Sequence, residues 1–291
     1  MSAAGSLAAS GIGQRIAALP LRHATVEGGV ISWREAGQGE PLVLLHGISS
    51  GSASWLQQLE HLSQSFRVMA WDAPGYGESA PLPVADPRAE DYALVLHRML
   101  SSQCGPMHLV GHSLGALVAA AYARAYPERL LSLSLLNPAV GYGSQAPEVR
   151  EAKLNGRLEQ VRRLGPEGLA EERAPALVSA RASPAALEIL RWNARRLTVG
   201  GYEQAARMLA SGDLLRDLAD IALPVMVLTG TADDITPPGS ADEAARAGRA
   251  VSRISLDGVG HASYVEDPQG VDAALAAFIR EHGTDAVEQV K

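Results

Sequence analysis

The chain has 291 residues, 47% of them hydrophobic, which is enough to bury the core of one large α/β domain or two small ones. Its net charge of −7 argues against nucleic acid or an anionic membrane surface as a partner, and no stretch approaches 18 uninterrupted apolar residues. The single cysteine, Cys104, excludes an intramolecular disulfide and a cysteine-based zinc site. These features favour a cytoplasmic protein that acts on a small molecule; the oligomeric state, monomer or homodimer, stays open.

The first 22 residues are rich in Ala, Gly and Ser and lack the basic start and continuous apolar core of a signal peptide. We expect residues 1–22 to form a loose extension. From there, short apolar runs alternate with longer helical patterns, which predicts a mostly parallel sheet with crossover helices. In chain order the expected elements are a strand pair at 26–35 turning at Gly28–Gly29, then a strand at 41–45, a helix at 54–63, a strand at 66–71, a helix at 87–103, a strand at 107–110, a helix at 114–125 and a strand at 131–136.

The pattern changes between residues 140 and 218, which are helical in character and nearly balanced in charge and contain no buried strand. Breaks are expected at Gly165–Pro166, Ser183–Pro184 and Gly200–Gly201. The sheet pattern then resumes with a strand at 225–229, a helix at 239–248, a strand at 252–256 and a helix at 268–281. Residues 23–139 and 219–284 are therefore predicted to form one core, and 140–218 a helical lid over the carboxyl edge of the sheet, where such sheets bind ligands.

A Gly-x-Ser-x-Gly pattern lies between a predicted strand and a predicted helix, with Ser113 at its centre. This context is typical of a nucleophile elbow, a strained strand-to-helix turn that exposes the serine oxygen and leaves no room for a Cβ on either side. The same pattern also occurs at Gly47–Gly51, around Ser49. The pattern alone therefore does not choose between the two serines.

The positions of a base and an acid favour Ser113. His261 follows the last predicted strand, and Asp233 follows the strand before it, which gives the chain order Ser, Asp, His that an elbow requires. His261 would take the serine proton, and Asp233 would orient the imidazole. Asp234 competes with Asp233 for this role, and Asp257 is a more distant candidate.

Ser49 lies one crossover earlier, on the first long loop after a strand. In an elbow architecture this loop supplies one backbone N–H of an oxyanion hole, and the residue after the nucleophile supplies the other. These donors would be Ile48 and Leu114, and Ser49 would shape the pocket floor and could contact substrate.

The chain resembles the α/β-hydrolase fold family from about residue 24 to 282. The resemblance rests on His46-Gly47, the turn Asp72-Ala-Pro-Gly-Tyr-Gly-Glu-Ser79, Gly111-His-Ser-Leu-Gly115, Gly230-x-x-Asp233 and Gly260-His261. It is also similar to enol-lactonases and meta-cleavage-product hydrolases of aromatic catabolism. The carbon–carbon hydrolases usually carry Asn before the nucleophile and a Gly/Pro-rich loop after His-Gly, where this chain has His112 and Ile48-Ser-Ser.

We therefore predict a cofactor-independent, metal-free serine hydrolase that cleaves a carboxylic ester, thioester or lactone of a small apolar or aromatic-derived substrate through an acyl-enzyme on Ser113. The alternatives are a carbon–carbon bond hydrolase of a ring-fission product and a non-catalytic ligand-binding member of the fold. Five further residues are candidates for substrate binding. They are Trp55, Tyr142, Trp192, Arg195 and Tyr264, of which Arg195 could bind a substrate carboxylate.

Overall fold

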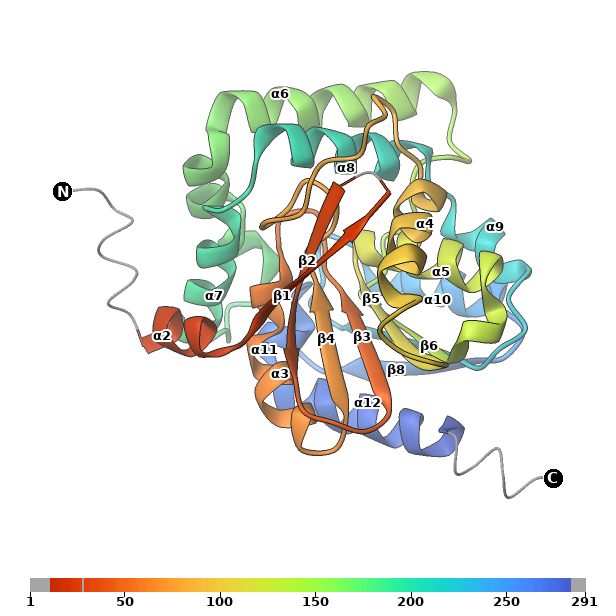
Figure 1. Cartoon of the computed structure of the whole chain (residues 1–291). Coiled ribbons are helices and arrows are strands. Elements are labelled where there is room, and N and C mark those ends of the chain that lie inside the picture. The colour runs from red at the N-terminus through yellow and green to blue at the C-terminus, as the bar shows by residue number, and fades with distance from the viewer. Residues whose placement is uncertain (1–10, 28, 284–291) are drawn as a thin grey trace.

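The apolar runs form one eight-stranded sheet in the order β1-β2-β4-β3-β5-β6-β7-β8 (Figure 1). The computed structural model describes residues 11–27 and 29–283. The strands are β1 (Leu21–Val26), β2 (Gly29–Ala36), β3 (Pro41–Leu45), β4 (Arg67–Trp71), β5 (Met107–His112), β6 (Leu130–Leu136), β7 (Val225–Gly230) and β8 (Val251–Leu256). Only β1 and β2 run antiparallel to their neighbours; from β4 to β8 the sheet is parallel, so the predicted α/β-hydrolase fold class is confirmed.

Helices cover both faces of this sheet, which explains why the central strands are apolar at consecutive positions rather than at alternate ones. Along β3, Val43 and Leu45 pack into the core on one face, whereas Leu42 and Leu44 pack into the core on the other. The first face is covered by α4 (Ala89–Leu100), α5 (Leu114–Ala125), α9 (Leu214–Ala219) and α10 (Pro238–Ala247). The second face is covered by α3 (Leu56–His61), α11 (Ser263–Glu266) and α12 (Pro268–His282), with the short 3₁₀ turns η1 (Ser52–Trp55) and η2 (Leu62–Gln64) on either side of α3. A third 3₁₀ turn, η3 (Pro127–Arg129), connects α5 to β6.

Between β6 and β7 the chain forms α6 (Pro147–Glu172), η4 (Ala174–Leu177), α7 (Pro184–Ala194), α8 (Val199–Ser211) and then α9. We call residues 140–218 the inserted segment. Figure 1 shows α6 and α8 lying side by side across one end of the sheet. The predicted break at Gly165–Pro166 is present, since Gly165 has a positive φ of 60° inside α6. None of the described helices combines the length and the hydrophobicity that crossing a membrane requires.

Two sequence predictions are wrong in their local detail. Gly200 and Gly201 do not break a helix but lie in the first turn of α8, where Thr198 provides the cap. The described part of the expected loose extension, residues 11–22, contains the helix α2 (Gly11–Ala18) and the start of β1; residues 1–10 and Gly28 lie outside the described residues. Ile12 and Ile16, four residues apart on one face of α2, are buried, which supplies the packing that anchors this segment.

Candidate active site

Ser113 occupies a strained turn between the end of β5 and the start of α5. Its backbone has φ 52° and ψ −115°, and among the described non-glycine residues only Ser113 and Asn137 have a positive φ. A Cβ on Gly111 would lie 2.5 Å from the carbonyl oxygen of Gly115, and one on Gly115 would lie 2.5 Å from that of Leu45. The two glycines are thus needed because strand and helix approach each other closely at the turn.

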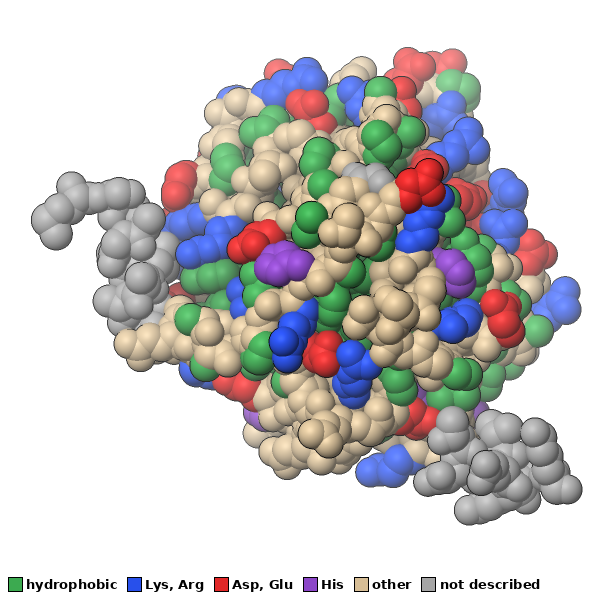
Figure 2. Space-filling view, viewed as in Figure 1, with side chains coloured by type: hydrophobic (Ala, Val, Ile, Leu, Met, Phe, Trp, Pro, Cys, Tyr) green, Lys and Arg blue, Asp and Glu red, His purple; other side chains and the backbone are tan. Residues whose placement is uncertain are grey.

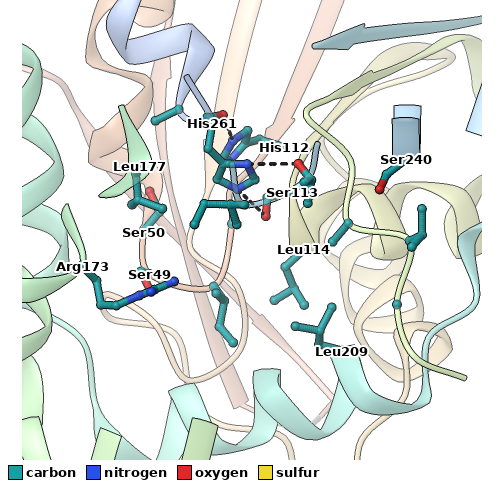
Figure 3. A pocket seen from close by; sticks show the side chains of 18 of the residues that line it. Ser49, Ser50, His112, Ser113, Leu114, Arg173, Leu177, Leu209, Ser240 and His261 are labelled. Carbon is teal, nitrogen blue, oxygen red and sulfur yellow. Dashed lines mark hydrogen bonds between the residues drawn. The ribbon is translucent and has the colours of Figure 1, made fainter. Parts of the chain in front are cut away.

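His261 links Ser113 to Asp233 through two hydrogen bonds, of which Figure 3 shows the one to Ser113. Its Nε2 lies 2.9 Å from Ser113 Oγ, and its Nδ1 lies 2.9 Å from Asp233 Oδ2. Because a carboxylate only accepts, Nδ1 carries the proton and donates it to Asp233, which leaves the Nε2 lone pair to accept the serine O–H. The three side chains are almost fully buried.

The carboxylate of Asp233 is held by hydrogen bonds on both oxygens. Oδ1 accepts from the backbone N–H of Ile235 and Thr236, at 2.8 and 2.9 Å. Oδ2 accepts from Thr236 Oγ1 and Asn137 Nδ2, at 2.7 and 2.8 Å, in addition to His261. Burial alone would raise the pKa of Asp233, but the hydrogen bond and charge of His261, with the other donors, lower it to about 2.

The competing acids lie elsewhere. Asp234 is exposed, and Asp257 accepts a hydrogen bond from Thr231 Oγ1. Sequence reasoning missed the role of Asn137 as a donor to Asp233, although its place at the end of β6 was a usable signal. Asn137 is fully buried, and its Oδ1 accepts a 2.6 Å hydrogen bond from Ser263.

His112, directly before Ser113, is a second residue whose role the sequence did not reveal. Its Nε2 donates to the backbone carbonyl of His261 at 2.9 Å, while its Nδ1 is buried without a partner in the described structure. Burial, and then the nearby His261, lower the pKa of His112 to about 3. It is therefore neutral at ordinary pH and holds the loop that carries His261.

Two backbone N–H groups beside Ser113 have no hydrogen-bond acceptor among the described residues. Leu114 is the first residue of α5, and a helix leaves its first N–H groups without an intrahelical partner. Among the described residues, none accepts a hydrogen bond from Ile48 N, whereas its carbonyl accepts one from Tyr76 Oη at 2.8 Å. A Cβ on Gly47 would lie 3.2 Å from Ser113 Cβ, so this loop passes close to the nucleophile.

These groups open into a cavity of about 180 Å³ between the sheet and the inserted segment. The predicted oxyanion-hole residues Ile48 and Leu114 line this cavity, and so do three of the candidate substrate-binding residues, Ser49, Tyr142 and Tyr264. Much of the remaining wall is apolar, with Leu177, Leu190 and Leu209 from the inserted segment and Ile235 from the core.

Three other candidates do not reach the cavity. Trp55 is fully buried and stacks on Tyr264, with ring centroids 4.0 Å apart. Trp192 lines a different cavity, and Arg196 lies over its indole ring. Arg195, the residue directly after α7, pairs with Glu167 and Glu171 of α6, so its guanidinium faces acidic side chains rather than a substrate.

Comparison with known proteins agrees with this geometry. The sequence model described as "Alpha/beta hydrolase family" matches residues 42–274, which is most of the chain. The chain belongs to the α/β hydrolase family. The predicted resemblance to this family is therefore confirmed.

Three similar proteins illustrate the range of this α/β hydrolase's relatives. The (E)-2-((N-methylformamido)methylene)succinate hydrolase of Acinetobacter baylyi is 28% identical over 84% of this chain and 92% of its own length. The pimeloyl-[acyl-carrier protein] methyl ester esterase of Vibrio vulnificus is 30% identical over 85% of this chain and 97% of its own. A solved thermophilic esterase from Thermogutta terrifontis, with malate bound, is 30% identical and has a TM-score of 0.81, over 91% of this chain and all of the esterase. The chain is a hydrolase of this family.

Proposed function

We propose that this protein is a cofactor-independent serine hydrolase that cleaves a carboxylic ester, thioester or lactone of a small substrate through an acyl-enzyme on Ser113. The observation that carries the proposal is the hydrogen-bond chain from Ser113 Oγ through His261 to Asp233, beside the unoccupied N–H groups of Ile48 and Leu114. The chain activates a nucleophile, and the N–H groups meet the charge that its attack creates.

In acylation, Ser113 Oγ attacks the carbonyl carbon while its proton passes to His261 Nε2. The carbonyl electron pair moves onto oxygen, and the N–H groups of Ile48 and Leu114 stabilise the resulting oxyanion. When this intermediate collapses, the bond to the leaving oxygen or sulfur breaks, and His261 Nε2 gives its proton to the leaving group. The acyl group remains on Ser113 as an ester.

Deacylation repeats these steps with water. His261 Nε2 takes one proton of a water molecule whose oxygen adds to the acyl carbon, and the same N–H groups stabilise the second oxyanion. Collapse breaks the bond to Ser113 Oγ, which recovers its proton from His261. The sum is substrate plus water giving a carboxylic acid and an alcohol or thiol, or a hydroxy acid from a lactone.

Three further observations support this assignment. The carboxylate of Asp233, with its pKa lowered to about 2, stays ionised and can stabilise the imidazolium that forms in both steps. The inserted segment would act as a lid that excludes water from an apolar pocket, since three of its leucines line the wall. Two of the similar proteins are named esterases, which favours an ester as the bond cleaved.

The test is covalent labelling with a fluorophosphonate, followed by mass spectrometry of the labelled peptide. We expect the label on Ser113 and turnover of p-nitrophenyl butyrate. Ser113→Ala should abolish labelling and reduce kcat by at least about 10³-fold.

The second copy of the pattern supplies a matched variant, because Ser49→Ala removes the other candidate serine and should leave the labelling of Ser113 intact. Labelling of Ser49 would contradict the assignment, as would a folded protein that takes no label. Rapid turnover of a ring-fission dienoate with negligible esterase activity would contradict the choice of bond.

A further inference from the structure

Two arginines line the cavity beside Ser113. Arg157 belongs to α6, and Arg173 is the residue that directly follows this helix. Both line the cavity together with Ser113 and His261. Among the described residues, no Asp or Glu contributes to the wall. The pocket is therefore cationic in a chain whose net charge is −7.

Arg173 has no carboxylate partner in the part of the chain that the structure describes. The neighbouring acids are engaged elsewhere, since Glu172 pairs with Arg163 and Glu171 with Arg191 and Arg195. Figure 3 shows Arg173 extending from the inserted segment toward the loop that carries Ser49 and Ser50. Its guanidinium donors are thus presented to whatever occupies the cavity.

Arg157 is half-buried and interacts with the phenol groups of Tyr142 and Tyr202. Burial opposes its charge, and the nearby phenol oxygens of these tyrosines more than offset it, so that the pKa of Arg157 is raised. Within the described chain it, too, forms no ion pair. An arginine stays charged at any pH at which proteins fold, so the wall of this pocket carries a permanent positive charge at Arg157.

Among the described residues, Arg157 and Arg173 are the arginines that line this cavity, and neither pairs with a carboxylate. Elsewhere in the inserted segment, Arg162 pairs with Glu203 and Arg207 with Asp86. The face drawn in Figure 2 likewise has acidic and basic side chains interspersed. A partly desolvated guanidinium without an anion is unfavourable, and a planar carboxylate is the group that its donors fit best.

We propose that the substrate carries a free carboxylate besides the bond that is cleaved, and that Arg173 and Arg157 bind this carboxylate. The proposal rests on the proposed function, since it names the substrate class of the same site. The carboxylate takes no part in the chemistry and leaves unchanged. The substrate is then a monoester of a small dicarboxylic acid, or an ester whose leaving alcohol bears a carboxylate.

The experiment compares matched esters that differ in charge. One pair is monomethyl succinate against methyl 4-methylpentanoate, which places the carboxylate on the acyl side. The other is 4-acetoxybenzoate against its methyl ester, which places it on the leaving side. We expect at least a tenfold higher kcat/KM for the anionic member of one pair at low ionic strength; equal or lower values for both anionic members would overturn the proposal.

Arg173→Gln tests the residue directly. It should reduce kcat/KM for the preferred anionic ester by about 30-fold or more, the loss expected when one partner of a desolvated charged pair is removed. Turnover of the neutral ester should stay within about threefold. Arg163→Gln is the control, because Arg163 is largely exposed and lies outside the cavity, and both esters should be unaffected. An equal loss for both esters in Arg173→Gln would refute a charge-specific role.

A binding measurement separates this proposal from the proposed function. Ser113→Ala protein is titrated calorimetrically with monomethyl succinate and with 4-acetoxybenzoate. The same titrations are repeated with the double variant that carries both Ser113→Ala and Arg173→Gln. If Ser113→Ala protein binds an anion and the added Arg173→Gln change abolishes this binding, the inference is supported even if the wild type cleaves no ester. Absence of ester cleavage would contradict only the proposed serine-hydrolase function. Absence of binding for both anions would sink the inference even if Ser113 is labelled.

Discussion

Replacing Asp233 with Asn removes the charge beside His261 while keeping the shape of the side chain. In the wild type, the carboxylate of Asp233 accepts hydrogen bonds from Asn137 Nδ2 and from the backbone N–H of Thr236. In the variant, the NH2 group of Asn would face one of these donors and could not accept its hydrogen bond. The imidazole of His261 would then be held in the wrong tautomer, for which the expected loss in kcat is roughly 10³–10⁴-fold. Stability should also fall. The pKa difference between the ordinary 3.8 and about 2 corresponds to about 2 kcal/mol.

The sign of the stability effect can be checked with pH. The folded-state pKa of Asp233 lies below the unfolded one, so its stabilisation is present above about pH 4 and is lost as the pH falls toward 2. Urea unfolding should show Asp233→Asn about 2 kcal/mol below wild type at pH 7, with the gap narrowing below pH 4. The control is Asp234→Asn, at an exposed position, which should change stability by less than about 0.5 kcal/mol and keep full activity. A folded Asp233→Asn with undiminished kcat, or an equal loss in Asp234→Asn, would refute this reasoning.

Two further predictions concern the glycine pair at the start of α8 and the histidine directly before Ser113. Gly201→Ala should lower the melting temperature because its Cβ would lie 2.1 Å from the carbonyl oxygen of Gly75. Gly200→Ala should instead raise stability by about 0.5–1 kcal/mol, because no atom beyond its own part of the helix lies within 4 Å of its Cβ and alanine favours the helix. Calorimetric melting of the two variants tests both expectations. The folded-state pKa of His112 is about 3, whereas its unfolded-state pKa is near 6.5, so protonation of the unfolded chain destabilises the wild type by roughly 2 kcal/mol at pH 5. His112→Gln should lack this loss of stability when urea unfolding is compared at pH 7.5 and pH 5. An identical pH dependence in variant and wild type would contradict the prediction.

The sheet could be predicted because its strands are short apolar runs separated by longer helical patterns. The helix at 114–125 was predicted with its observed limits, since nearly all its residues are small or apolar and pack across the sheet. The helix α2 escaped prediction because its signal is only two isoleucines, Ile12 and Ile16, in a segment dominated by small residues. The glycine pair in α8 was wrongly predicted to break a helix. Gly201 instead allows α8 to approach Gly75 closely, a tertiary contact that the sequence does not reveal.

For the candidate site, the residues that follow strands were predictable and those on the inserted helices were not. Parallel strands end at one edge, so Ser113, Asp233 and His261 had to meet there whatever the details of packing. The side of a helix that faces a cavity depends instead on how that helix packs against its neighbours. Arg195 was one candidate for binding a substrate carboxylate, but the packing of α7 on α6 places it against Glu167 and Glu171. Two other arginines, which no sequence pattern indicated, line the cavity instead.

The two Gly-x-Ser-x-Gly segments show why context decides the role of a serine. At Ser113, strand and helix meet so closely that the flanking glycines are required and the serine takes a positive φ. At Ser49 no such strain exists, since the described chain has no positive φ there and Gly51 is extended. A strained turn persists only where the surrounding structure fixes it. The Ser113 turn is fixed on both sides by the sheet and α5, whereas the Ser49 loop presents its backbone, with the free N–H of Ile48 at the edge of the cavity.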